Sequence, residues 1–142
     1  MPYQVIEKYI TEKFPGVTQS EHFGYKFFMY ATDDRLPFAT IALADNEYDS
    51  ISNLNRDGIF RVNIGVSKLT FTQLFHNHNT EWDYTALNQF MPHPDYAAQH
   101  YICVLNPEGD ILSETFKFIG EAYLIAKTRF EKRAAAQTKK SS

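Results

Sequence analysis

The run IFRVNIGV at residues 59–66 constrains the fold of this chain more than any other segment. From position 60 onward, every second residue is apolar: Phe60, Val62, Ile64 and Val66. A period of two is typical of a β-strand that buries one of its faces. The run therefore predicts a one-faced strand, and it places Arg61 and Asn63 on the face that points away from the core.

Helical periodicity appears near both ends of the chain. Apolar residues recur at spacings of three and four over residues 3–14, ahead of Pro15 and Gly16, which predicts an amphipathic helix. A longer stripe with the same spacing consists of Leu112, Phe116, Ile119, Tyr123, Ala126 and Phe130. Because such a stripe must be buried, we expect both helices to cover a sheet.

Further strands are predicted between these helices. They are VTQSEHFG and YKFFMYAT, joined by a turn at Gly24, then FATIALA, and later HYICVLN. Ser67 is expected to cap a short helix over KLTFTQLF. The pattern predicts an α+β fold: an antiparallel sheet of about five strands, with N-terminal and C-terminal helices packed mainly on one face. We expect one domain over residues 1–133 and a disordered basic tail over residues 134–142.

Charge is unevenly distributed along the chain. The last sixteen residues carry six Lys or Arg and one Glu, a net +5, whereas the preceding residues carry a net −8. An acidic body argues against nucleic acid as a partner, since nucleic-acid binding needs a basic face. No apolar run reaches the roughly 18 residues of a membrane span. The first residues do not resemble a signal peptide, so we expect no membrane partner and a cytoplasmic location.

Cys103 is the single cysteine of the chain, and it lies within the apolar run YICVL. An isolated cysteine in such a run is expected to be buried and unreactive. This expectation agrees with a reducing compartment.

Four longer segments occur in a fixed order along the chain. They are PFATI (residues 37–41), NLNRDGIFRVNIGVS (53–67), MPHPDYAAQ (91–99) and CVLNP (103–107). Together they resemble a bacterial family known only as a domain of unknown function. More distantly, the order of elements resembles the MmcQ/YjbR group, which has a CyaY-like sheet and is often labelled DNA-binding. The resemblance implies an MmcQ/YjbR-like fold, and it implies no catalytic residue.

The first candidate ligand site surrounds the alternating run and contains Arg56, Arg61 and Asn63. Arginine can make a planar, two-pronged contact with a carboxylate or a phosphate. Alternatively, the two arginines pair with acids of the preceding loop while the asparagines cap its backbone. The acids available for such pairing are Asp45, Asp49 and Asp57.

The second candidate cluster lies in MPHPDYAAQ and contains His93, Tyr96 and Gln99. A histidine held between two prolines is stiff, and its imidazole could act as a base or contact a ligand. Alternatively, His93 anchors its own irregular loop through hydrogen bonds.

Metal and cofactor signals are weak. His76 and His78 are separated by one residue, but real sites need three or four converging ligands. The sequence has no glycine-rich phosphate loop, nucleophile elbow or pair of cysteines. We therefore expect no metal and no cofactor.

The favoured functional hypothesis is a non-catalytic binding or interaction module for an anionic small molecule or a protein partner. The alternative is an enzyme of the hydrolase or transferase type, with His93 as general base and Arg61 holding an oxyanion. DNA binding, as in the distant MmcQ/YjbR relatives, is a further alternative. Aromatic residues on both faces of YKFFMY also predict that some of them are covered by a second layer, a ligand or a second subunit. We expect a homodimer through the face without helices, which competes with the ligand site for the same surface.

Overall fold

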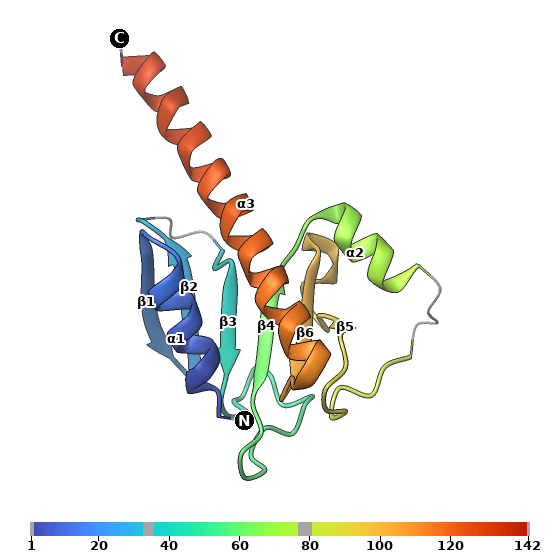
Figure 1. The fold of residues 1–142 in the computed structure, drawn as a ribbon. Coiled ribbons are helices and arrows are strands. Elements are labelled where there is room, and N and C mark those ends of the chain that lie inside the picture. Colours follow the sequence, from blue (N-terminus) through green and yellow to red (C-terminus); the bar gives the residue numbers. More distant parts are fainter. Residues whose placement is uncertain (1, 33–35, 77–80, 142) are drawn as a thin grey trace.

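The computed structural model of the protein describes residues 2–32, 36–76 and 81–141. In that part of the chain, six strands form one antiparallel sheet in the order β1-β2-β3-β4-β6-β5 (Figure 1). The strands are β1 (Val17–His22), β2 (Tyr25–Tyr30), β3 (Ala39–Ala42), β4 (Arg61–Gly65), β5 (Met91–Pro92) and β6 (Tyr101–Leu105). The helices are α1 (Gln4–Lys13), α2 (Lys68–Phe75) and α3 (Gly109–Ser141), with a 3-10 turn η1 (Ala97–Gln99).

The expected α+β class is confirmed, with α1 and α3 on the same face of the sheet (Figure 1). The strand that the sequence pattern did not predict is β5, a two-residue edge strand in which Met91 pairs with Cys103. A strand this short contains no period that could distinguish it from a loop.

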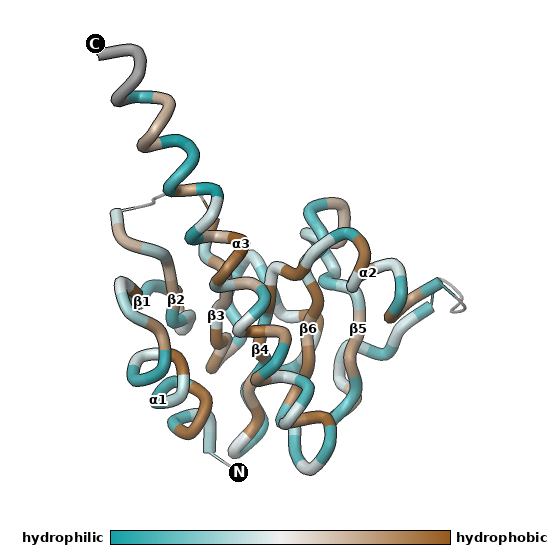
Figure 2. Tube along the Cα trace, turned by 45° about the horizontal axis from the view of Figure 1, so that its top comes forward, coloured by the Kyte–Doolittle hydropathy of each residue, from teal (hydrophilic) through white to brown (hydrophobic). Residues whose placement is uncertain are grey.

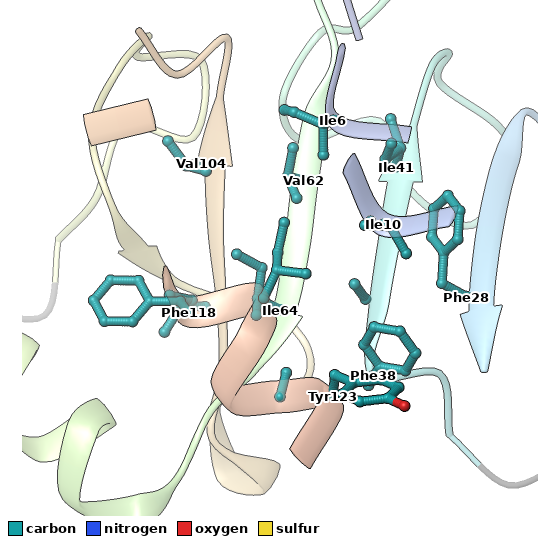
Figure 3. Close-up of a cluster of buried hydrophobic side chains, with 14 of the residues drawn as sticks. Ile6, Ile10, Phe28, Phe38, Ile41, Val62, Ile64, Val104, Phe118 and Tyr123 are labelled. Atoms are coloured by element: carbon teal, nitrogen blue, oxygen red, sulfur yellow. The ribbon is translucent and has the colours of Figure 1, made fainter. Parts of the chain in front are cut away.

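The main core lies between the sheet and these two helices. The four alternating residues of the run at 59–66 all belong to it: Phe60, Val62, Ile64 and Val66. Figure 3 shows Val62 and Ile64 of β4 pointing toward Ile6 and Ile10 of α1 and toward α3. The predicted register of β4 is therefore confirmed.

The inner face of α3 is wider than the predicted stripe. Ile119 and Tyr123 are buried as expected, but Phe118 and Ala122 are buried beside them. A helix that packs over several strands buries more than one line of side chains.

The opposite face of the sheet is partly covered by the loops of the chain itself. A second, smaller apolar cluster lies there, made of Ala42, Leu54, Met91, Cys103 and Leu105. Trp82 and Tyr84 pack against it from the loop that follows α2. Burial raises the pKa of the Cys103 thiol to about 12, so this cysteine is protonated and enclosed, as the sequence predicts.

Helix α3 continues well past the sheet, and Figure 1 shows its C-terminal part extending away from the body. Hydrophilic residues recur along this outer part in Figure 2, whereas hydrophobic residues gather where α3 meets the sheet. The backbone is helical through Ser141, and the disordered tail over residues 134–142 stays a prediction. Among the described residues, no helix has the length and apolar character needed to cross a bilayer.

Ile64→Val is expected to lower the free energy of unfolding by about 1 kcal/mol, because it removes one methylene from a closed core. Ile51→Val makes the same chemical change at a loop side chain that is 48% exposed, and it should have almost no effect. Urea denaturation of both variants and the wild type measures the difference. Equal losses at the two positions would contradict the assigned register of β4.

Candidate ligand-binding site

Arg61 is fully buried on the face of the sheet that carries no helices. Its guanidinium forms an ion pair with Asp49 and donates to the Ser52 hydroxyl at 3.0 Å. Both partners lie in the long loop between β3 and β4. The structure therefore has Arg61 paired with an acid of that loop, so its charge is neutralised inside the fold.

The same acid also binds a tyrosine from β2, because Asp49 accepts a hydrogen bond from the Tyr25 hydroxyl. Burial raises the pKa of Asp49, but the hydrogen bonds from Arg61 and Tyr25 outweigh it, and the net pKa lies below the ordinary value. Burial raises the pKa of the Tyr25 hydroxyl, and the hydrogen bond to Asp49 raises it further. Asp49 is thus ionised and Tyr25 is a neutral donor at neutral pH.

Arg61 also fixes the direction of a hydrogen-bond chain across β4 and β3. Its Nε donates to Oδ1 of Asn63 at 2.9 Å, so the Asn63 amide must turn its nitrogen the other way. That nitrogen donates to the Thr40 hydroxyl oxygen at 2.8 Å, across the paired positions Thr40 and Asn63. Thr40 therefore accepts from Asn63, and its own proton has no acceptor among the described residues.

His93 follows β5 and is buried. Its Nδ1 accepts hydrogen bonds from the backbone N–H groups of Asp95 at 3.0 Å and Tyr96 at 3.1 Å. Two donors at Nδ1 require a lone pair there, so the ring is neutral and carries its proton on Nε2. Burial is the main cause that lowers the pKa of His93, and the positive charge of Arg61 lowers it further, to about 4.

A cavity of about 280 Å³ opens beside these groups. Its polar wall includes Thr40, Asn63 and His93, together with Tyr25 and Asp49. The tyrosine and the acid are already engaged with one another, and Asn63 is held between Arg61 and Thr40. Among the described residues of this wall, the Thr40 hydroxyl and Nε2 of His93 are donors on buried residues that have no protein acceptor.

The mouth of this cavity is apolar and exposed. Four large residues that border it are exposed, two of them by more than half and two by nearly half: Phe23, Tyr48, Leu36 and Tyr96. A cleft with an apolar mouth and a few convergent polar groups has the usual character of a small-molecule site.

Only some of the six residues expected at a ligand site come together. Asn63, His93 and Tyr96 line the cavity, while Arg61 is buried next to it and contacts Asn63. Arg56 instead donates to backbone carbonyls of its own loop and of Thr85. It lines a separate and more open depression of about 480 Å³.

Gln99 borders a third depression, of about 200 Å³, against α3. Neither Arg56 nor Gln99 lines the cavity of His93. Sequence reasoning missed Thr40, Tyr25 and Phe23 as cavity residues. The alternation of YKFFMY could have placed Tyr25 and Phe27 on one face, but the pairing of Thr40 with Asn63 depends on a register that no single strand reveals.

The metal candidates are not supported by the described part of the chain, where no three His, Cys, Asp or Glu side chains converge on a possible ion. Nδ1 of His76 lies 3.0 Å from the carbonyl oxygen of Gln73, at the end of α2. His78 lies outside the described residues.

Fold and site together define a small α+β protein with a ligand-sized cavity on the loop-covered face of its sheet. A family model matches residues 1–135, and the chain belongs to that family, which is described as a family of unknown function, DUF6194. No curated protein and no solved structure matches the chain. The resemblance to the MmcQ/YjbR group is not confirmed by these comparisons.

Proposed function

We propose that the protein is a non-catalytic binding module that holds an uncharged small molecule in the cavity between Thr40 and His93. The observation that carries this proposal is the polarity of the cavity wall. The Thr40 hydroxyl and Nε2 of His93 are both donors, and neither has an acceptor among the described residues. A ligand with a carbonyl oxygen or a ring nitrogen would satisfy them.

The charge of the site favours an uncharged ligand over an anion. The expectation of an anionic ligand depended on Arg61, whose charge is compensated by Asp49. A second acid, Asp95, borders the cavity. An anion would therefore meet two carboxylates, and the described residues of the cavity wall include no Lys or Arg to balance them.

The state of His93 favours binding over catalysis. A general base needs a lone pair directed at the substrate, but the lone pair of His93 is occupied by two backbone N–H groups. The other ring nitrogen, Nε2, carries the proton, so it can donate a hydrogen bond to a ligand but cannot abstract a proton from one. The hydrolase or transferase alternative loses its proposed base.

Benzamide and benzoate are suitable probes, because they share a ring and differ in charge. We expect benzamide to shift the NMR signals of Thr40, Asn63 and His93, and to bind at least about 10-fold more tightly than benzoate. Tighter binding of benzoate would restore the anionic hypothesis. Absence of any shift at the cavity with benzamide would overturn the proposal.

Thr40→Val and Thr40→Ser form a matched pair for this test. Valine has a similar size to threonine but lacks the hydroxyl. We expect the Thr40→Val variant to bind benzamide about 5-fold more weakly than the wild type, which corresponds to the loss of one hydrogen bond. Serine keeps the hydroxyl and should retain most of the affinity. Titrations followed by NMR give the dissociation constants, and equal values for the two variants would show that Thr40 does not contact the ligand.

A homodimer is the second candidate, because Phe23, Tyr48, Leu36 and Tyr96 place four exposed apolar side chains around one cavity mouth. Such a dimer would cover the surface through which a ligand enters. Sedimentation velocity of the purified protein tests it directly. A cytoplasmic location belongs to the same proposal, and it is supported by the single, buried Cys103.

A further inference from the structure

Phe23 forms the tip of the hairpin between β1 and β2 in a conformation that disfavours it. Its φ is +55°, and Gly24 after it has a φ of +80°. A two-residue hairpin turn with both φ values positive is the type that favours Asn followed by Gly. A bulky side chain in this left-handed region is strained.

Nothing in the fold compensates this strain by burying the ring. Phe23 is 70% exposed, and its ring makes an edge-to-face contact with the ring of Tyr48, which is 75% exposed, at a centroid distance of 6.2 Å. Strain that persists without a gain in packing is characteristic of functional positions.

Hydrogen bonds fix the two backbone segments that carry these rings. Asn46 donates through its side chain to the carbonyl oxygen of Phe23 at 3.3 Å, which attaches the hairpin tip to the β3–β4 loop. Oδ1 of Asn46 accepts hydrogen bonds from the backbone N–H groups of Tyr48 at 2.8 Å and Asp49 at 3.0 Å. Asp49 in turn is fixed by Arg61, so the rim that carries both rings is anchored to β4.

The wall of the cavity behind these rings is also aromatic. Tyr25 and Phe27 lie on the same face of β2, with ring centroids 5.9 Å apart, and both line the cavity. The cavity is therefore lined by four aromatic side chains, Phe23, Tyr25, Phe27 and Tyr48, and a ligand ring within it could make offset or edge-to-face contacts with them.

We propose that Phe23 and Tyr48 clamp a planar aromatic ring of the ligand at the cavity mouth. The ligand class is then an aromatic molecule that carries a hydrogen-bond acceptor for Thr40 and His93. This inference rests on the proposed function, and it adds the ring as the recognised group and Phe23 as the residue that selects it.

The test compares benzamide with cyclohexanecarboxamide, which has the same amide on a saturated ring. Wild-type protein is expected to bind benzamide about 3- to 10-fold more tightly, because aromatic contacts favour a planar ring. Phe23→Asn should abolish most of this preference. The same variant should raise the Tm by about 3 °C, since Asn–Gly suits the turn. Leu69→Asn, at an exposed position on α2, is the control and should leave both affinities unchanged.

The possible results distinguish failure of the aromatic clamp from failure of the proposed function. If both amides bind equally and Phe23→Asn changes neither, the clamp is overturned while the proposed function stands. If neither amide binds, the proposed function and the clamp both fail. If the wild type sediments as a dimer and Phe23→Asn as a monomer, the rings are a contact between two copies, and the clamp is overturned.

Discussion

Arg61→Ala is expected to lower the free energy of unfolding by about 3–5 kcal/mol, because the change leaves Asp49 without its buried cation. The guanidinium also bonds Ser52 and Asn63, so its loss disconnects the β3–β4 loop from β4. Urea denaturation at neutral pH measures the loss. The effect would be near zero only for an arginine held in solvent.

Two further variants make this test specific. Arg56→Ala removes an arginine that binds backbone carbonyls, and it should cost less, about 1–2 kcal/mol. The double variant of Arg61→Ala with Asp49→Ala should recover part of the loss, since the unpaired acid is then gone as well. A cost below about 1 kcal/mol for Arg61→Ala would show an accessible guanidinium and would revive the anionic ligand.

The regular elements of the fold follow from local patterns. The alternation in β4 determines which face is buried, and Ser67 caps α2 by accepting from the Thr70 backbone N–H at 3.1 Å. The edge strand β5 has no such pattern, because its two residues pair with β6 only through tertiary contacts. Local signals predict elements with several turns or several alternations, and they miss those fixed by a neighbour.

The site was less predictable because it depends on contacts between distant segments. The sequence placed Arg61 and Asn63 correctly on one face, but it offered several aspartates as partners of Arg61. The path of the β3–β4 loop selects Asp49. Thr40 gains its role through its pairing with Asn63, and the conformation of Phe23 depends on a turn whose Gly24 alone was recognisable.

The stability of the protein is expected to fall as the pH drops from about 7 to about 5, by about 2 kcal/mol, because of His93. Its folded pKa of about 4 lies below the ordinary value of 6.5. Between these values the unfolded chain binds a proton that the folded chain excludes, so stability is complete above the unfolded pKa and decreases below it. Chemical denaturation at the two pH values measures the difference. Asp49, whose pKa is also lowered, adds a further loss only at more acidic pH.

His93→Asn isolates this contribution, because the asparagine oxygen can accept from the same backbone N–H groups and has no proton to gain in this range. The variant should show little change between about pH 7 and pH 5, whereas His100→Asn should keep the wild-type loss because His93 is intact. A loss that persists in His93→Asn would assign the effect to another group. A wild type equally stable at both values would mean that His93 accepts a proton in the folded state, so Nδ1 would no longer be committed to its loop. In that case the ring could serve as a base, and the enzyme hypothesis would again have a candidate for proton transfer.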